Sequence, residues 1–173
     1  MFAIEPEGVE PDLMTMGKGI ADGFPLSAMV TRPEIAAAFK PGDHLSTFGG
    51  NPVSCAAALA AVRFYRQRNL AERAREKGDW FARDLRTRLA GESRVGEVRG
   101  RGLMIGVELV RDASRAPAPE LACAVRAACR ENGVLLGLGG AFGNVLRIQP
   151  PLVITDEQLV SVAEAITTAI QNG

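Results

Sequence analysis

A lysine between two glycines is the first group in this chain that could do covalent chemistry. Lys18 stands between Gly17 and Gly19, shortly after the apolar pair Leu13 and Met14. Flanking glycines permit unusual backbone dihedrals and let a ligand approach closely. Apolar neighbours can remove water from the amine, which favours its neutral form and frees its lone pair to attack a carbonyl. Lys18 is therefore a candidate Schiff-base lysine, and the alternative is a solvated turn residue.

A long loop is the second candidate. The run from Lys40 to Pro52 has no hydrophobic periodicity, and ordered loops of this length are commonly functional. Ser46, Thr47 and the amides of the nearby glycines could donate hydrogen bonds to a phosphate, because exposed N–H groups in a nest bind anions. The alternative is a plain surface loop.

Arg147 is the third candidate, because it interrupts a short apolar segment between Leu146 and Ile148. The planar guanidinium offers two parallel donors that match a carboxylate. The alternative is an arginine on an edge strand that faces water.

Composition excludes several classes of partner. The chain has 173 residues, of which 47% are hydrophobic, and its 20 basic and 20 acidic residues cancel. Zero net charge argues against nucleic acid or an anionic membrane as the main partner. No apolar run reaches the length of about 18 residues that a membrane span needs. The N-terminus lacks the basic region of a signal peptide.

Cysteine and histidine give no metal or hydrolytic site. The three cysteines, Cys55, Cys123 and Cys129, form no CxxC pair, which predicts neither a disulfide framework nor a thiolate metal site and fits a reducing cytoplasm. We expect them to be small apolar fillers of helices. His44 is the only histidine and has no Ser/His/Asp set or metal-ligand spacing around it.

The first half of the chain must position Lys18 and the loop. We expect a strand at 26–31 and a helix from Val53 to about Leu89, with a break at Asn69. The segment from Cys55 to Val62 is apolar on all sides, which predicts that it is buried.

The second half reads as a small α/β unit that must position Arg147. Its glycine pattern at 100–106 resembles a dinucleotide fingerprint, but the spacing is wrong and the run joins strand to strand, so we reject that reading. Thr155 and Gln158 form a capping box that opens a last helix. Alternating strands and helices predict an α/β layer, with strands at 95–99, 103–110, 134–138 and 144–149 and a further helix at 119–131.

Three segments together resemble a known family. MTMGKGIADGFP at 14–25, HLSTFGGNP at 44–52 and NVLRIQPPL at 144–152 are similar to class III pyridoxal-phosphate aminotransferases, of the alanine–glyoxylate and 4-aminobutyrate type. The resemblance covers the whole chain, with the motifs in order. It implies a transaminase that moves an amino group from an amino acid or amine to a 2-oxo acid or aldehyde, in a cytoplasmic homodimer with no metal.

The resemblance also implies a role for each candidate. Lys18 matches the lysine that holds pyridoxal phosphate and later shuttles a proton. Thr47 matches a threonine that donates to the cofactor phosphate of the partner subunit. Arg147 matches an arginine that pairs with the substrate carboxylate.

The implied fold is the fold-type I transferase, an α/β architecture. Residues 1–55 would end the large cofactor-binding domain, 56–92 would be a long interdomain helix, and 93–173 would form the small C-terminal α/β domain. Family members are much longer, and their upstream part carries a phosphate loop, an aromatic that stacks on the cofactor ring and an aspartate that pairs with the pyridine nitrogen.

We therefore expect a C-terminal portion that binds the cofactor weakly and does not transaminate by itself. Two alternatives stay open. The chain could be a non-catalytic remnant that only dimerises or binds a partner, or it could come from a related decarboxylase, racemase or aminomutase of the same fold.

Overall fold

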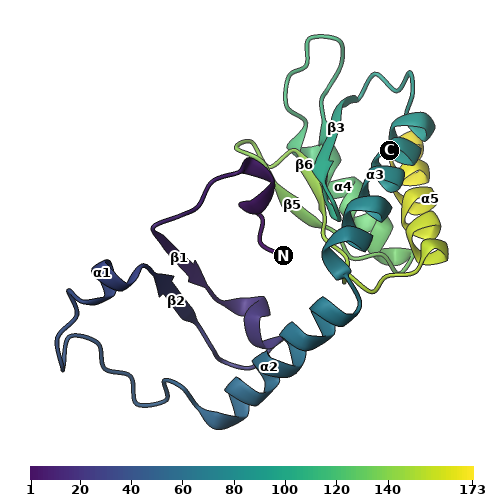
Figure 1. Ribbon diagram of the computed structural model, residues 1–173. Helices are drawn as coiled ribbons and strands as arrows, with labels where there is room; N and C mark the ends of the chain where they lie inside the picture. The colour runs from purple at the N-terminus through teal and green to yellow at the C-terminus, as the bar shows by residue number, and fades with distance from the viewer. The chain divides into compact units, whose positions relative to one another are not determined.

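The computed structural model describes residues 1–173 and divides into two units (Figure 1). We call Met1–Asn69 unit 1 and Leu70–Gly173 unit 2. Both contain helices and strands, which confirms the mixed α/β class. The boundary falls within the segment 56–92, where two helices replace the expected single one: α2 (Pro52–Gln67) and α3 (Leu70–Arg88). Asn69 separates them with a φ of 48°, so the break expected at this residue is confirmed.

Unit 1 is built on a two-stranded hairpin that leads into helix α2. Strands β1 (Leu13–Met16) and β2 (Ala28–Thr31) pair antiparallel, and Leu13 lies opposite Thr31. The Thr31 hydroxyl donates to the carbonyl of Asp12 at 2.9 Å, which closes the open end of the hairpin. Three short helices complete the unit: η1 (Glu5–Glu7), η2 (Lys18–Ala21) and α1 (Pro33–Ala36).

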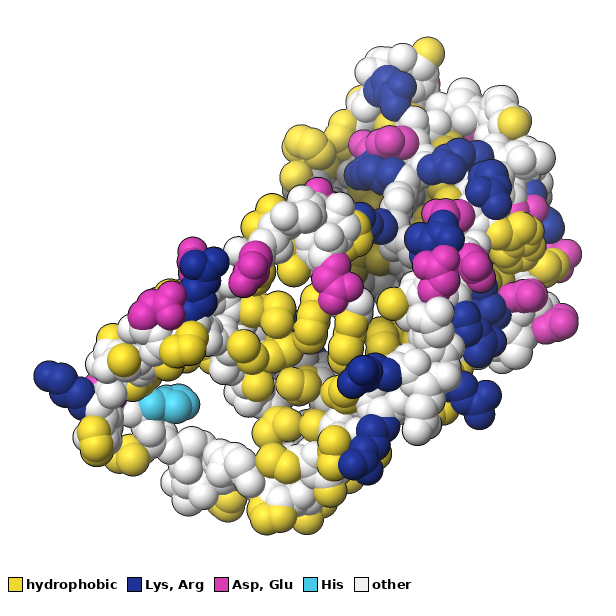
Figure 2. Space-filling view, in the orientation of Figure 1, with side chains coloured by type: hydrophobic (Ala, Val, Ile, Leu, Met, Phe, Trp, Pro, Cys, Tyr) yellow, Lys and Arg dark blue, Asp and Glu magenta, His cyan; other side chains and the backbone are white.

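Unit 1 has almost no buried core of its own. Ala21 and Ser54 are its only buried residues. The expected burial of Cys55 to Val62 is wrong in this structure, because η2 alone packs against α2 within unit 1 and Leu59 stays 51% exposed. Figure 2 shows hydrophobic side chains gathered over the hairpin and α2. Unit 1 therefore presents apolar surface of the kind that marks an interaction site.

Unit 2 is a four-stranded antiparallel sheet covered by three helices. The strand order is β3-β4-β6-β5, so β3 and β5 are the edges and β6 is internal. Helices α3, α4 and α5 pack against the sheet or against one another. The remaining elements are β3 (Val95–Arg101), β4 (Met104–Leu109), α4 (Pro119–Glu131), β5 (Gly137–Gly139), β6 (Val145–Ile148) and α5 (Asp156–Asn172).

Most of the expected elements of unit 2 are confirmed, and one is shifted. The capping box is present, because Gln158 N–H donates to the Thr155 hydroxyl at 3.2 Å and the Gln158 side chain accepts from Thr155 N–H. The strand expected at 134–138 begins only at Gly137. The reason is that Val134 N–H donates to the Cys129 carbonyl at 2.9 Å, so Val134 still takes part in the capping of α4, which ends at Glu131.

The core of unit 2 fills the space between one sheet face and the helices. Alternate strand residues point inward, and these are the buried ones. Each large apolar side chain buried in this way contributes about 1.5–3 kcal/mol. The sheet supplies Ile105, Val107, Leu109, Leu146 and Ile148, and the helices supply Phe81, Leu85, Val125, Leu159 and Ile166. None of the helices is long and apolar enough to cross a membrane.

Helix α3 touches the β3–β4 turn backbone to backbone. A Cβ added at Gly78 would lie 1.9 Å from the carbonyl oxygen of Gly102. Ala in place of Gly in a helix normally stabilises by about 1 kcal/mol. Here we expect Gly78→Ala to destabilise the protein by about 1–3 kcal/mol, because the methyl overpacks a rigid contact. Chemical denaturation measures the change, and Gly139→Ala, which enters open space, is the control. An equal or higher stability of Gly78→Ala would contradict this packing.

The uneven burial predicts uneven protection of the backbone. Local stability follows the number of buried apolar contacts. Amide hydrogen exchange should therefore be faster in β1 and β2 than in β4 and β6, although all four are paired strands. Equal protection of the two sheets would show that unit 1 is stabilised by something other than its own core.

Candidate active site

Lys18 occupies a strained position at the end of strand β1. Its φ is 51°, in the left-handed region that residues other than glycine rarely adopt. Such a conformation costs about 1–3 kcal/mol and is concentrated at functional sites. The unusual dihedral falls on the lysine and not on its glycine neighbours, since Gly17 is extended with a φ of −159° and Gly19 has no positive φ.

A cavity of about 370 Å³ lies beside Lys18. Lys18 is exposed, so this chain does not provide the desolvation expected from Leu13 and Met14. The lysine side chain forms no hydrogen bond or ion pair, which leaves its amine available to a ligand. The sequence did not point to Asp22, which contributes a carboxylate to the same cavity. The lining residues are Lys18, Gly19, Asp22, Gly23, Phe24, Pro25 and Leu26.

Small residues anchor the Lys18 turn on helix α2. Helix η2 begins at Lys18 and packs against α2. Ala21 in η2 is fully buried, and Ser54 in α2 is 2% exposed. Two backbone bonds then close the turn, from Asp22 N–H to Gly19 O and from Phe24 N–H to Ala21 O at 3.1 Å. The strained lysine is therefore held from its C-terminal side.

The loop before α2 presents Thr47 to solvent with its donors free. Thr47 is exposed, and neither its hydroxyl nor its backbone N–H has a partner. Successive turns shape the loop, with Gly49 N–H donating to Ser46 O at 3.3 Å and Gly50 at a φ of 66°. Thr47 does not line the Lys18 cavity. The free donors agree with the anion-binding role that the sequence suggested, which stays a prediction.

The side chain of Asn51 fixes the junction between loop and helix. Its Oδ1 accepts from the backbone N–H groups of Val53 at 2.9 Å and Ser54 at 3.2 Å. These N–H groups would otherwise have no partner in the first turn of α2. An anion at this loop must therefore rely on Thr47 and the amide of Gly50 rather than on the helix end.

Arg147 lies on the outward face of unit 2. Leu146 and Ile148 on either side of it point into the core at 0% and 3% exposure, so strand alternation turns Arg147 outward. It is exposed and forms no hydrogen bond or ion pair. The alternative of an edge-strand arginine that faces water is wrong about the strand, because β6 lies between β4 and β5, and agrees with the exposed side chain.

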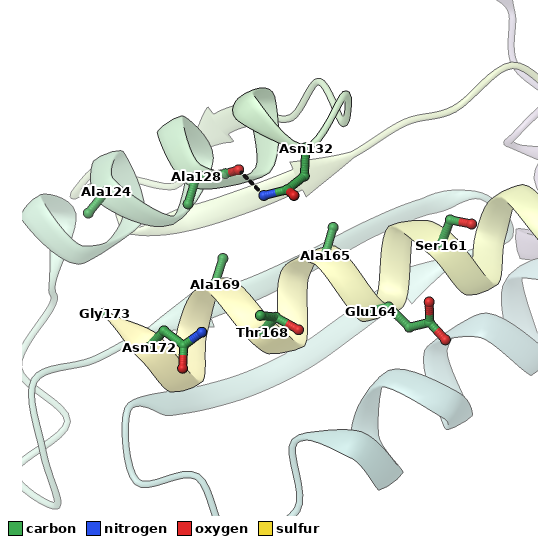
Figure 3. Close-up of a pocket in the computed structure, with 10 residues that line it drawn as sticks. All are labelled: Ala124, Ala128, Asn132, Ser161, Glu164, Ala165, Thr168, Ala169, Asn172 and Gly173. Carbon is green, nitrogen blue, oxygen red and sulfur yellow. Dashed lines mark hydrogen bonds between the residues drawn. The ribbon is translucent and has the colours of Figure 1, made fainter.

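A cavity larger than the one beside Lys18 lies in unit 2. A groove of about 540 Å³ separates α4 from α5, and Ala124 and Ala128 of α4 lie opposite Ala165 and Ala169 of α5 (Figure 3). None of the three candidate residues lines it. We place the candidate site at the Lys18 cavity because the chemistry requires an amine nucleophile, and no lysine lines the α4–α5 groove.

The cysteines and the histidine add no further site. Cys129 is buried in α4, and burial raises the pKa of its thiol. Cys55 and Cys123 are exposed, so the expectation that all three fill helix interiors holds for Cys129 alone. No group of three or more possible metal-ligating side chains is present.

Comparison with known proteins agrees with the three motifs. The sequence profile of the family Aminotransferase class-III matches residues 1–170. The 4-aminobutyrate aminotransferase of Mycobacterium bovis is 47% identical over 162 residues, which are 92% of this chain and 36% of that protein. The "Alanine--glyoxylate aminotransferase 2 homolog 2, mitochondrial" of Arabidopsis thaliana is 42% identical over 166 residues, 95% of this chain and 35% of that protein. The solved structure of a phospholyase from Arthrobacter, in complex with phosphoethanolamine, matches this chain with a TM-score of 0.90 and 37% sequence identity. The match covers 95% of this chain and 40% of the phospholyase chain.

The chain belongs to the class III aminotransferases, a pyridoxal-phosphate-dependent family. The resemblance noted in the sequence is thereby confirmed. The chain spans well under half the length of these relatives.

Loss of the Asn51 cap should loosen the loop that carries Thr47. We expect Asn51→Ala to cost about 1 kcal/mol, because two backbone donors of α2 lose their acceptor. Amide exchange at Val53 and Ser54 should accelerate. Asn51→Asp, which keeps an acceptor oxygen at the same place, should stay close to wild type. Unchanged exchange in Asn51→Ala would mean that the cap does not hold this junction.

Proposed function

We propose that the chain carries the cofactor lysine and two ligand-binding residues of a pyridoxal-phosphate-dependent transaminase. The observation that supports this most is the exposed, unpaired Lys18 on a strained backbone beside a cavity. The substrates are an amino acid or amine donor and a 2-oxo acid or aldehyde acceptor. Residues 1–55 belong to the large domain, 56–92 to the interdomain segment and 93–173 to the small domain.

The residues present fit this cofactor. Pyridoxal phosphate has an aldehyde and a phosphate, and an amino-acid or 2-oxo-acid substrate has a carboxylate. Lys18 offers a free amine, Thr47 offers a free hydroxyl and N–H, and Arg147 offers a free guanidinium. When bound, the cofactor supplies an electron sink that stabilises negative charge on the substrate carbon.

Each of the three residues then has its own role. Nζ of Lys18 would hold the cofactor through its aldehyde, and the Lys18 amine would move the proton that leaves the substrate α-carbon. Thr47 donates to phosphate oxygens. Arg147 receives the substrate carboxylate in a bidentate pair, which fixes the orientation of the α-carbon.

Thr47 acts in a second copy of the chain, within a homodimer. Leu45 and Phe48 beside it are 84% and 80% exposed, more than any other large apolar residue of unit 1. Apolar side chains of this size are usually covered by a partner. A symmetric contact at this loop buries both and brings Thr47 to the neighbouring site.

Two other functions have specific support. The sparse core of unit 1 favours a non-catalytic remnant that dimerises or binds a partner. The likeness to the Arthrobacter phospholyase shows that this architecture also occurs in an enzyme that is not named as a transaminase. A related decarboxylase, racemase or aminomutase is therefore the third candidate.

Addition of pyridoxal phosphate to the purified chain tests the proposal. We expect a visible absorption band, distinct from that of free cofactor, in wild type and not in Lys18→Ala. Binding should be weak and transamination by the chain alone undetectable, because the Lys18 amine is open to water. Lys40→Ala is the matched control, since Lys40 is also an exposed lysine of unit 1 and should leave the band unchanged.

The outcomes separate the three functions. A band that persists in Lys18→Ala, or no band at all, would favour the remnant. Robust transamination by the 173-residue chain would contradict the expectation that it binds the cofactor weakly and is inactive alone, and would support the proposed transaminase function. Cofactor-dependent loss of carbon dioxide or change of chirality, without amino transfer, would favour the related reactions.

A further inference from the structure

Arg147 lies in a row of residues that crosses the sheet of unit 2. Strand pairing places Arg99 of β3 opposite Gly106 of β4, Gly106 opposite Arg147 of β6, and Arg147 opposite Gly137 of β5. Paired residues share one face of a sheet, and the face of this row is the outward one. Arg147 is thus flanked by a glycine on each neighbouring strand.

The guanidinium of Arg147 occupies the place where a side chain at position 137 would begin. A Cβ added to Gly137 would lie 2.9 Å from Nε, 3.0 Å from Nη2 and 3.3 Å from Cζ of Arg147. These distances are shorter than ordinary van der Waals contacts. Gly139, two residues along the same face of β5, has nothing within 4 Å of an added Cβ. The close approach is therefore specific to Gly137.

The neighbouring carboxylates do not hold Arg147 in this place. Nη1 of Arg99 donates to Glu97 at 3.0 Å and also to Glu108, so one arginine engages both acids. The hydrogen bond with Glu108 raises the pKa of Arg99 above its ordinary value. Arg147 has no such partner. Its pose depends on the open backbone beneath it, and its donors stay free.

We propose that Gly137 is a positioning residue for Arg147, because the Nε and Nη2 edge of the guanidinium is set in place for a carboxylate by the space that a side chain at position 137 would fill. The proposal rests on the proposed function only for the identity of the ligand. A methyl group at position 137 displaces the end of a flexible side chain and leaves the backbone in place, so the sheet stays folded. Displacement lowers carboxylate affinity, because a preorganised fork loses less freedom on binding.

The side-chain Nε–Hε resonances of arginine in the full chain test this directly. The resonance of Arg147 is assigned by its loss in Arg147→Gln. We expect it to shift in Gly137→Ala before any ligand is added and to stay in place in Gly139→Ala. Glutarate serves as the carboxylate probe. Its affinity at Arg147 should fall about tenfold in Gly137→Ala, the loss expected for one charge-assisted hydrogen bond, and stay unchanged in Gly139→Ala.

The two proposals fail in different ways. An Arg147 resonance and glutarate affinity that are the same in Gly137→Ala and wild type would overturn the positioning role. A shifted resonance with no glutarate binding to wild type would support positioning and count against Arg147 as the carboxylate residue. If Gly137→Ala does not fold, the folding of the double variant Gly137→Ala/Arg147→Ala tests whether the contact with Arg147 is the cause. Recovery of folding supports the steric contact, and no recovery contradicts it.

Discussion

The inward face of the unit 2 sheet is the constraint on which the rest of that unit depends. Val107 and Leu146 lie opposite each other and are fully buried, and α3, α4 and α5 supply the other half of the core. Successive side chains along a strand point to opposite faces of the sheet. Because Leu146 and Ile148 point into the core, the side chain of Arg147 lies on the outward face. The packing of the core therefore turns Arg147 outward, and the absence of a side chain at Gly137 leaves the space that its guanidinium occupies.

Unit 1 follows the opposite principle. Local backbone geometry holds its candidate catalytic residue, Lys18. This lysine has a left-handed conformation and begins the short helix η2, which follows strand β1 and contains the buried Ala21. Little apolar burial supports that geometry. The exposed apolar side chains of the hairpin and α2 form surface of the kind that marks an interaction site.

Local patterns in the sequence predicted the features that depend on neighbours in the chain. The capping box at Thr155 and the break at Asn69 both follow from local rules. Features that depend on distant pairing could not be read in the same way. The internal position of β6 comes from the strand order, and the fit between Gly137 and Arg147 comes from a register that no single segment encodes.

The wrong expectations have physical causes of the same kind. Cys55 to Val62 has the composition of a buried helix, but burial is set by what packs against it, and within unit 1 that is η2 alone. Glycines beside Lys18 suggested that they would carry the unusual dihedral, whereas the lysine itself does. A glycine inside a strand can indicate close approach of another group. Gly137 is such a glycine, and its sequence position alone does not show that the group is Arg147.

The central claim is that Lys18 differs chemically from the other lysines, Lys40 and Lys77. Borohydride fixation at increasing pyridoxal phosphate concentration, followed by peptide mapping, measures this directly for all three in one sample. The account predicts that Lys18 is labelled to completion while Lys40 and Lys77 stay largely unlabelled. Parallel labelling of the three lysines, or labelling of Lys18 last, would contradict it.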